Sequence, residues 1–486
     1  MRFSAILKHT GYERLRPGDP EISSVVKDAA KARPGSLYVC IQGISGDGHD
    51  HIAEAAANGA AAIVCDKRLP EYPSGMAAAL VKNSRLALGF ICKNFCGDPL
   101  AGINVTGVTG TNGKTSVTYF LEAIYGAAGR LGGVIGTSGV RIGGKPLDFA
   151  FATATTPDPI ELFEIFRLMR GSGVREIVME ATSHALALDK VGAVSFNHGI
   201  FTNLTQDHLE FHGSFENYLA AKKKLFALSE TGIINADDAY GARLAESGPR
   251  GFYTYGVENK ADFKAKNISY TKGGSYFDLM AMGERIDGFF LPIPGGFSVY
   301  NALGAIASAL LAGVSPGDVK RGLASVKAIP GRIQPVENDA GLSVIVDYAH
   351  TPDGLEKVIK AVRSFTGGRV ITVFGCGGDR DRTKRPLMGK IAGALSDFCV
   401  VTSDNPRSEK PEDIIAEILP GLLSSGCKYT AEPDRKAAIH AAIGMIGPDD
   451  AVIIAGKGHE DYQEFENKRR VRFDDREVAA ARLRRE

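Results

Sequence analysis

A glycine-rich loop between an expected strand and an expected helix constrains this chain more than any other feature of its sequence. The strand covers 103–108, the helix runs from about 114 to 128, and the loop reads Gly107-Val108-Thr109-Gly110-Thr111-Asn112-Gly113-Lys114-Thr115-Ser116. Such a loop turns backbone N–H groups toward phosphate oxygens, and the following helix adds its positive end. The pattern predicts a phosphate loop, with Lys114 on the β- and γ-phosphates and the Thr115 hydroxyl on magnesium. The alternative is an ordinary strand–helix turn, since strict P-loop spacing would place a glycine at Val108.

Strand and helix patterns alternate on both sides of this loop. Expected helices lie at 52–62 and 301–311, and expected strands at 36–41, 62–65, 176–180, 232–236, 342–347, 370–374, 398–402 and 451–455. Alternation of this kind is typical of parallel sheets with helices on both faces. We therefore predict an α/β protein of three domains. They are a small N-terminal α/β domain at 1–99, a central P-loop ATPase domain with a mostly parallel sheet at 100–333, and a C-terminal Rossmann-like domain at 334–486.

Composition narrows the class of protein. A chain of 486 residues is too long for one hydrophobic core. Its 57 basic and 56 acidic residues give a net charge of +1, so no overall field attracts nucleic acid or an anionic membrane. No stretch is apolar enough for a signal peptide or a membrane span, and seven scattered cysteines suit a reducing compartment. We expect a cytoplasmic monomer that acts on small molecules, without nucleic acid or membrane partners.

Three further residues are candidates for chemistry near the loop. Glu180 ends an apolar strand, where its carboxylate could meet magnesium. His208 follows an aspartate after another apolar run, and Lys222 lies on an amphipathic helix at 218–226. Composition alone favours plainer roles, namely a solvated strand-end acid, a structural histidine and one of three solvent-exposed lysines.

Taken together, these motifs resemble the Mur ligase family over nearly the whole chain. The matching stretches are Thr109 to Thr115, Glu180 with Ser183-His184, Asn203-Leu204 with Asp207-His208, Ala221-Lys222, Tyr300-Asn301-Ala302, Gly331-Arg332 and Asp347 to Pro352. The resemblance implies an ATP-dependent ligase in which a substrate carboxylate becomes an acyl phosphate that an amine then attacks. It also implies an N-terminal domain for a uridine-nucleotide substrate.

The resemblance assigns the ATP site and the metal site. It implies that the catalytic residues are Lys114, Glu180, His208 and Lys222. The implied magnesium site consists of Thr115, Glu180, His208 and Lys222, with Lys222 modified by carbon dioxide to N6-carboxylysine, an anion suited to magnesium. The implied ATP contacts are Gly110, Thr111, Asn112, Gly113, Lys114, Thr115, Ser116, Asn301, Arg332, Asp347 and His350.

The C-terminal segment indicates the amine. Asp404-Asn405-Pro406-Arg407 matches the signature of the branch of the family that adds meso-2,6-diaminopimelate, whose second carboxylate Arg407 could grip with paired hydrogen bonds. The lysine-adding branch lacks this arginine. Arg385, Gly456 and Glu460 match the remaining amino-acid contacts. Nearby, 375–379 imitates a dinucleotide fingerprint, but Arg380 stands where its last glycine would be, so NAD is not expected.

The residues expected to bind the UDP-linked muramyl dipeptide match the family less closely. The implied contacts are Thr155, Thr156, Thr182 and Lys190. Where the family usually reads Asp-Ser-Arg, this chain reads Asp28-Ala29-Ala30, Leu188 replaces a glutamine, and Gln334 stands where a glutamate is common. Ala29 and Leu188 cannot make the same hydrogen bonds, whereas Thr182 and Lys190 keep a hydroxyl and a charge.

Three alternatives to this function can be compared with the sequence. A related ligase with another acyl substrate, such as folylpolyglutamate synthase or cyanophycin synthetase, would not predict the 404–407 signature beside a uridine-type N-terminal domain. A lysine-adding ligase would not need Arg407. A non-catalytic nucleotide-binding protein would be expected to lack Lys114, Glu180 or Lys222, and all three are present.

Overall fold

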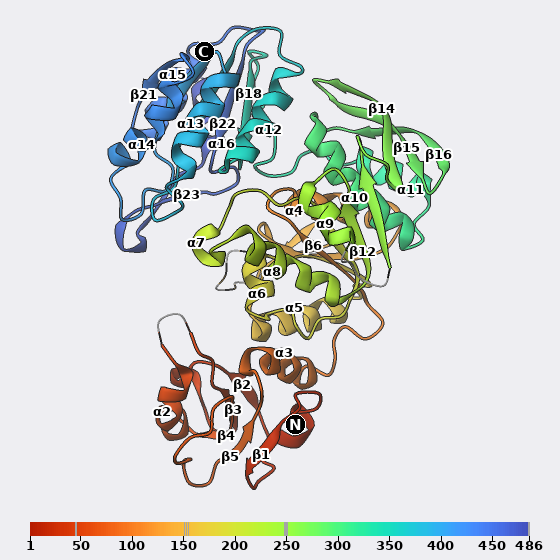
Figure 1. Ribbon diagram of the computed structural model, residues 1–486, viewed down its shortest axis with the longest axis vertical. Coiled ribbons are helices and arrows are strands. Elements are labelled where there is room, and N and C mark those ends of the chain that lie inside the picture. The colour runs from red at the N-terminus through yellow and green to blue at the C-terminus, as the bar shows by residue number, and fades with distance from the viewer. Residues whose placement is uncertain (44–45, 150, 152, 154, 247–250, 485–486) are drawn as a thin grey trace.

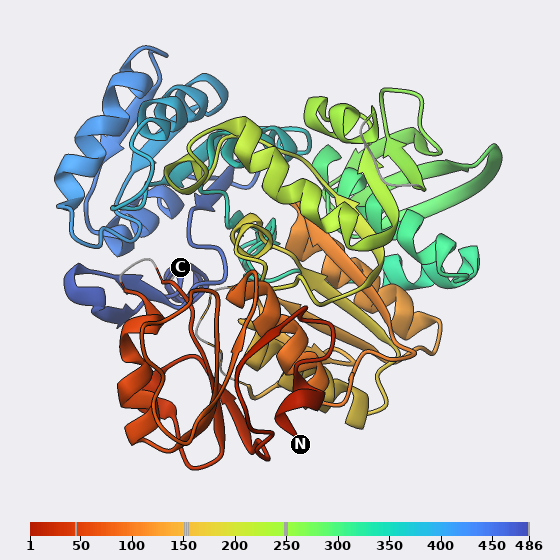
Figure 2. The same ribbon diagram turned by 60° about the horizontal axis from the view of Figure 1, so that its bottom comes forward.

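The computed structural model contains three sheets that follow one another along the chain (Figures 1 and 2). It describes residues 1–43, 46–149, 151, 153, 155–246 and 251–484. The sheets lie within 13–80, 104–291 and 334–455, so the predicted domain boundaries fall between them. The prediction of an α/β protein with mostly parallel sheets is confirmed. Among the described residues, no helix is long and apolar enough to cross a membrane.

The N-terminal sheet has the strand order β1-β5-β4-β3-β2, and only β1 runs antiparallel to its neighbour. Its strands are β1 (Glu13–Arg16), β2 (Ser24–Val26), β3 (Ser36–Val39), β4 (Ala60–Cys65) and β5 (Ala77–Leu80), and its helices are α1 (Phe3–Ile6), α2 (Ile52–Ala57) and α3 (Ser84–Phe95). The helix expected at 52–62 ends at Ala57, because Gly59 takes a left-handed conformation (φ +95°) before β4.

The central sheet is parallel in its middle and antiparallel at both edges. Its order is β16-β15-β14-β13-β12-β11-β6-β10-β7-β8-β9. The strands of the parallel block are β6 (Asn104–Thr109), β7 (Gly132–Gly136), β10 (Glu176–Glu180), β11 (Phe196–Phe201), β12 (Ser229–Asn235), β13 (Phe252–Gly256) and the first part of β14 (Phe263–Thr271). Antiparallel strands extend it, namely β15 (Gly274–Ala281), β16 (Glu284–Leu291), β8 (Gly139–Ile142) and β9 (Lys145–Leu147).

Helices bury both faces of this sheet. They are α4 (Lys114–Ala127), α5 (Pro159–Gly171), α6 (Ser183–Ala187), α7 (Leu209–His212), α8 (Phe215–Ala227), α9 (Ala239–Glu246), α10 (Gly296–Leu311) and α11 (Pro316–Ala324). One core joins α4 and α10 to the sheet through Phe120, Ile200 and Leu303. A second core joins α5 to α1 and α3 of the N-terminal domain through Phe3, Ile91 and Phe163, so this core is shared by two domains.

The C-terminal sheet has the order β17-β18-β22-β19-β20-β21, parallel except for β17. Its strands are β17 (Gln334–Pro335), β18 (Ser343–Asp347), β19 (Val370–Phe374), β20 (Phe398–Val401), β21 (Lys428–Ala431) and β22 (Ala451–Ala455). Its helices are α12 (Pro352–Arg363), α13 (Lys384–Leu395), α14 (Pro411–Leu423), α15 (Arg435–Ile443) and α16 (Asp475–Leu483). A separate hairpin, β23 (Tyr462–Glu464) with β24 (Arg470–Arg472), lies beside the loop that follows β20.

Candidate active site

The phosphate loop connects the end of β6 to the start of α4, as the sequence predicts. Gly113 has φ +89°, and a Cβ there would lie 2.2 Å from Oδ1 of Asn301, so only glycine fits. Asn203 fixes the loop by accepting hydrogen bonds of 2.9 Å from the backbone N–H of Thr111 and of Asn112. Nζ of Lys114 donates to the carbonyls of Gly110 and Thr111, both at 3.0 Å. Hydrogen bonds with Asn203 and Lys114 therefore hold the loop in this shape.

Glu180 stands at the end of β10, one strand away from the phosphate loop, and only 1% of it is exposed. Its Oε1 accepts hydrogen bonds from Oγ1 of Thr115 at 2.9 Å and from the backbone N–H of Thr137 at 3.0 Å. Oγ1 of Thr137 also lies 3.1 Å from Oε2 of Glu180 and 3.1 Å from Oγ1 of Thr155. Thr137 was not predicted as a site residue, because a threonine that follows a glycine-rich strand does not by itself indicate a functional site.

Two more threonines continue this hydroxyl network away from the loop. Oγ1 of Thr156 donates to the backbone oxygen of Glu180 at 2.8 Å and lies 3.1 Å from Oγ1 of Thr182. Thr182 is the N-cap of α6. The three threonines predicted for the acyl substrate are thus linked to Glu180, Thr155 through Thr137 and Thr182 through Thr156, which bonds to the backbone oxygen of Glu180.

Lys222 differs from the two lysines beside it on α8. It is 1% exposed, whereas Lys223 and Lys224 are exposed. Its Nζ lies 4.4 Å from the ring centre of Tyr218, and no described residue accepts a hydrogen bond from it. Burial, together with the charge of Lys114, holds the pKa of Lys222 well below its ordinary value. The interpretation of Lys222 as a solvent-exposed lysine is wrong.

His208 lines the same cavity as Glu180 and lies in a charged corner beside Asp207. It takes a left-handed conformation (φ +54°), and its Nε2 is 3.3 Å from Oδ2 of Asp207. Burial raises the pKa of Asp207, but the neighbouring His208, His350, Lys384 and Lys114 lower it more, so the carboxylate is ionised. Within the described part of the chain, no cluster of three His, Cys, Asp or Glu side chains forms a ready metal cage.

A cavity of about 270 Å³ connects the phosphate loop to the C-terminal domain. From the central domain it is lined by Thr111, Asn112, Gly113, Lys114, Thr115, Thr137, Thr155, Glu180, Thr182, Asp207 and His208. Arg332, at the end of the central domain, lines it too, and the C-terminal domain adds Tyr348, His350, Gly377, Arg380, Lys384, Asp404, Asn405, Arg407, Gly456 and Glu460. Most of the predicted ATP and amino-acid contacts therefore share one cavity.

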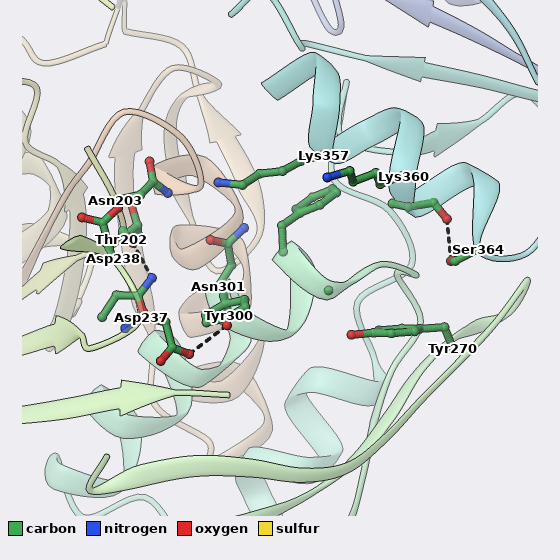
Figure 3. Close-up of a pocket in the computed structure, with 14 residues that line it drawn as sticks. Thr202, Asn203, Asp237, Asp238, Tyr270, Tyr300, Asn301, Lys357, Lys360 and Ser364 are labelled. Carbon is green, nitrogen blue, oxygen red and sulfur yellow. Dashed lines mark hydrogen bonds between the residues drawn. The ribbon is translucent and has the colours of Figure 1, made fainter. Parts of the chain in front are cut away.

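Three of the other predicted ATP contacts line two adjoining pockets between the same domains, whereas Gly110 lines none of these three hollows. Ser116, Asn301 and Asp347 line a pocket of about 50 Å³ next to Gly113. Asn301 also lines a larger pocket of about 490 Å³, where Lys357 of α12 reaches toward it (Figure 3). Oδ2 of Asp237 accepts a 2.8 Å hydrogen bond from Tyr300 in this pocket. The three hollows form a row from the amino-acid residues past the phosphate loop.

The loop after β20 places its polar groups with help from two neighbouring segments. Nδ2 of Asn405 donates to Oε2 of Glu460 at 2.9 Å, and Nζ of Lys457 donates to Oδ1 of Asn405 at 3.0 Å. Oδ2 of Asp404 is buried without a hydrogen-bond partner among the described residues, and a Cβ on Gly456 would lie 2.3 Å from it. Pro406 itself does not line the cavity. A buried acceptor without a donor is costly, so this oxygen is suited to a ligand.

The hairpin β23–β24 holds Arg407. Its Nε donates to Oε1 of Glu464 at 3.0 Å, and its Nη1 donates to the carbonyl of Gly378 at 2.8 Å. The backbone at Arg407 is left-handed (φ +51°) and pairs with the hairpin, since its N–H donates to the carbonyl of Glu464. The guanidinium is thus aimed into the cavity by contacts on its other side.

Arg385 and Arg380 occupy different environments from those expected. Arg385 is fully buried on α13, and its guanidinium donates hydrogen bonds of 2.8–2.9 Å to the carboxylates of Glu409 and Glu417. It does not line the cavity. Arg380, which the sequence marked only as breaking a dinucleotide fingerprint, lines the cavity near Arg407. The role of Arg385 in amino-acid binding stays a prediction, and Arg380 is a further candidate that the cavity lining adds.

Lys190 and Lys222 also stand apart from the cavity lining. Nζ of Lys190 is bound by Asp158 at 2.6 Å, at the junction of the central and N-terminal domains. Lys222 lies behind the lining, next to Tyr218, whose hydroxyl is 3.1 Å from Oγ1 of Thr111. The phosphate loop and Lys222 are linked through this tyrosine.

Comparisons with known proteins agree with this arrangement. Three family models match in order: "Mur ligase family, catalytic domain" at 21–95, "Mur ligase middle domain" at 108–309, and "Mur ligase, glutamate ligase domain" at 331–458. UDP-N-acetylmuramoyl-L-alanyl-D-glutamate–2,6-diaminopimelate ligases are similar over nearly the full length. The one from Clostridium botulinum is 42% identical, covering 98% of each chain, and ligase 1 of Clostridium acetobutylicum is 44% identical, covering 99% of this chain and 98% of that one.

Solved structures extend the comparison. A structure of a ligase with that same name superposes with a TM-score of 0.68 at 29% identity, over 96% of this chain and 95% of that one. A folylpolyglutamate synthase from Mycobacterium tuberculosis shares the fold, with a TM-score of 0.65 at 17% identity, over 82% of this chain and 94% of that one.

Proposed function

This chain belongs to the Mur ligase family, and we propose that it joins meso-2,6-diaminopimelate to UDP-N-acetylmuramoyl-L-alanyl-D-glutamate at the expense of ATP. Such a reaction supplies a peptide precursor of the bacterial cell wall and takes place in the cytoplasm. The similarity of this chain to two proteins named as diaminopimelate ligases, over about the full length of each, supports this choice of substrates. The resemblance to folylpolyglutamate synthase concerns the fold alone.

The single observation that carries the proposal is the shared cavity. Lys114 and Thr115 of the phosphate loop line the same hollow as Asp404 and Arg407. A ligase must bring the γ-phosphate, the acyl carboxylate and the amine to one point, because an acyl phosphate formed elsewhere would be hydrolysed before use. A cavity built from two domains also allows closure to exclude water.

ATP would lie along the row of hollows. Its phosphates fit against Gly110, Gly113 and Lys114, where the N-terminus of α4 and the ammonium offset their charge. Lys114 would exchange its two carbonyl acceptors for phosphate oxygens. The adenosine end would extend past Asn301 into the pocket shown in Figure 3. This orientation directs the γ-phosphate toward Glu180 and the acyl carboxylate.

The residues around Glu180 fit a magnesium ion that arrives with ATP. A buried carboxylate next to a threonine hydroxyl offers two hard oxygen donors, and magnesium prefers few protein ligands plus phosphate oxygens. Thr115, Glu180, His208 and a carbamate on Lys222 would hold the metal or its water ligands. When bound, the ion would offset the negative charge on the transferred phosphoryl group.

The environment of Lys222 suits carbamate formation. Only a neutral amine can attack carbon dioxide, and burial of Lys222 favours its neutral form. The new N–C bond forms as a proton leaves the nitrogen, and the product carries one negative charge. That charge would balance Lys114, which now destabilises the protonated form of Lys222.

The chemistry then proceeds in two steps. An oxygen of the γ-carboxylate of the D-glutamate residue attacks the γ-phosphorus, and the bond to ADP breaks. The amine of diaminopimelate attacks the acyl carbon, loses a proton, and phosphate leaves with the former carboxylate oxygen. Thr155, Thr156 and Thr182 would position the acyl group beside Glu180.

Diaminopimelate has two ammonium and two carboxylate groups, and the far end of the cavity offers partners for both kinds. Arg380 and Arg407 fit carboxylates. The unpaired Oδ2 of Asp404 and the carboxylate of Glu460 fit an ammonium group. Lysine lacks the distal carboxylate and would leave an arginine without its partner.

An isotope experiment tests the reaction. The purified protein is given ATP, magnesium, diaminopimelate and the UDP-dipeptide carrying heavy oxygen in its γ-carboxylate. We expect a tripeptide product and one heavy oxygen in the released phosphate. Phosphate without label, or label without a tripeptide, would sink the proposed reaction.

A further inference from the structure

A fully buried arginine lies behind the amino-acid end of the cavity. Arg435 is the first residue of α15; its side chain has no exposed surface, and it does not line the cavity. Its guanidinium makes four hydrogen bonds, which go to the backbone of Ser403, the backbone of Ala455 and both carboxylate oxygens of Asp475. Burying a guanidinium is costly unless its N–H groups are paired, so these acceptors decide what the arginine does in the fold.

Two of the acceptors are backbone carbonyls at the carboxyl ends of two strands. Nη1 of Arg435 donates to the carbonyl of Ser403 at 3.1 Å, and Nη2 donates to the carbonyl of Ala455 at 2.9 Å. Ser403 comes just after β20, and Ala455 is the last residue of β22. In the sheet β19 lies between β20 and β22, so these two strands are not paired with each other. Arg435 therefore bridges the two strand ends across β19.

The residue after each of these carbonyls lines the amino-acid end of the cavity. Asp404 follows Ser403, and Gly456 follows Ala455. The two loops approach closely, because a Cβ on Gly456 would lie 2.3 Å from Oδ2 of Asp404 and 3.8 Å from Nη2 of Arg435. A small shift of either strand end would thus move the unpaired oxygen of Asp404, which is the oxygen suited to an ammonium group of the substrate.

Asp475 fixes the other edge of the guanidinium. It is the first residue of α16 and is fully buried, and its two carboxylate oxygens accept hydrogen bonds of 2.8 Å from Nε and 2.7 Å from Nη2 of Arg435. A paired contact of this kind fixes the plane of the guanidinium and directs its other N–H groups at the two carbonyls. A lysine has one ammonium nitrogen, which cannot reproduce this planar set of contacts.

We propose that Arg435 is a positioning residue for the amino-acid substrate, which sets the distance between the loop of Asp404 and the loop of Gly456. Asp475 orients Arg435 for this role. The inference rests on the proposed function, since that function supplies diaminopimelate as the substrate. Arg435 acts on the substrate only through the two loops, and the buried ion pair links α15 and α16 to amine binding.

The plainer alternative is that Arg435 only stabilises the C-terminal domain. Arg363 on α12 offers a matched control, because it makes the same kinds of contact at the opposite ends of the strands. Its guanidinium pairs with Asp397 and donates to the carbonyls of Gly368 at 3.1 Å and Leu395 at 3.2 Å. These carbonyls come just before β19 and β20, and none of the four residues lines the cavity.

The measurement is the KM for each of the three substrates, together with urea unfolding of each variant. For Arg435→Lys we expect KM for diaminopimelate to rise about tenfold or more, while KM for ATP and KM for the UDP-dipeptide stay unchanged. Arg363→Lys should keep all three KM values, whatever stability it loses. Asp475→Asn weakens the buried ion pair but leaves Arg435 beside its two carbonyls, so it should lose stability with a smaller rise in KM for diaminopimelate.

A double variant covers the case in which Arg435→Lys does not fold. Arg435→Met combined with Asp475→Leu removes both buried charges together, a replacement that folded proteins often tolerate. It also removes the bridge between the two carbonyls, so it should fold and show the raised KM for diaminopimelate.

Three results would overturn the proposal. They are an unchanged KM for diaminopimelate in the folded variants without the bridge, a rise of all three KM values in step with lost stability, and a failure of both Arg435→Lys and the double variant to fold. Turnover by the unmodified protein is measured first. A lack of tripeptide from the unmodified protein would refute the proposed function, whereas tripeptide formation with an unchanged KM in the variants would refute the positioning role alone.

Discussion

Nε of Arg407 donates a 3.0 Å hydrogen bond to Oε1 of Glu464, which places the guanidinium at the amino-acid end of the cavity. The other oxygen of Glu464 is 3.3 Å from Nε of Arg470, an exposed residue on the same hairpin. Glu464 is thus a positioning residue. It acts on the amino-acid substrate only through Arg407.

Glu464→Gln should weaken this hold on Arg407. We expect KM for diaminopimelate to rise about tenfold, because a hydrogen bond between charged groups is lost, while KM for ATP stays unchanged. Arg470→Ala is the matched control and should have little effect, since exposed ion pairs contribute little. Equal effects on both KM values would mean that Glu464 supports the domain as a whole.

Lys222→Met should abolish ligation, because methionine keeps the volume of the buried stem but cannot form a carbamate. The expected loss in kcat is on the order of a hundredfold or more. Lys223→Met, on the exposed face of the same helix, is the control. Intact mass should show added carbon dioxide on the unmodified protein and none on Lys222→Met; full activity of Lys222→Met would contradict the role.

The activity should also depend on pH and carbon dioxide. Because burial lowers the pKa of Lys222, a larger share of its amine is neutral at a given pH than in an exposed lysine, and that share shrinks as pH falls. We therefore expect activity to fall on the acidic side, and to recover more fully when bicarbonate is added. Insensitivity to carbon dioxide depletion after long dialysis would count against a carbamate.

Gly113→Ala tests the shape of the phosphate loop. A Cβ there would lie 2.2 Å from Oδ1 of Asn301, and alanine is strained at φ +89°. We expect ATP affinity to fall about tenfold or more, measured by calorimetry. Gly126→Ala, in the same helix with open space around it, should bind ATP normally.

Arg380→Ala and Arg385→Ala should fail in different ways. Arg385→Ala leaves Glu409 and Glu417 without their buried partner and should lower the free energy of unfolding by about 3 kcal/mol. Arg380→Ala should keep stability and raise KM for diaminopimelate. Urea unfolding with steady-state kinetics on both variants measures the contrast; destabilisation of both would place Arg380 in a structural role.

The ion pair between Arg385 and Glu409 should make the stability of the fold depend on pH in the acidic range. Hydrogen bonds from Arg385 hold the pKa of Glu409 at about 2, below its ordinary 4.5. A lowered carboxylate pKa stabilises the fold above pH 4.5, and this contribution is lost as pH falls from 4.5 toward 2. Arg385→Ala should therefore show a weaker fall in stability across this range than the unmodified protein. An unchanged slope would contradict the pairing.

The contrast between Arg385 and Arg380 indicates what a sequence can and cannot predict here. Strands such as 176–180, 370–374 and 451–455 were predicted at their observed bounds, because buried parallel strands are continuous apolar runs. Two arginines five residues apart look alike in sequence. Only the fold shows that one is buried between glutamates and the other faces a cavity.

Other differences have similar causes. The strands β14 to β16 were not predicted. Much of β14 and β16 is exposed, and in β15 polar residues interrupt the apolar ones, so none of the three gives a continuous apolar run. The helix expected at 301–311 begins at Gly296, since a glycine pair reads as a loop. The ion pair between Lys27 and Asp158 could not be predicted, because the two residues are far apart in the sequence.

The ratio of kcat/KM for diaminopimelate to that for lysine tests the central claim most directly. It is measured on the unmodified protein with ATP, magnesium and the UDP-dipeptide, and the product mass is read for each amine. The account predicts at least about a hundredfold preference for diaminopimelate, since lysine leaves Arg407 without a carboxylate in a partly buried site. Equal or greater efficiency with lysine would contradict it.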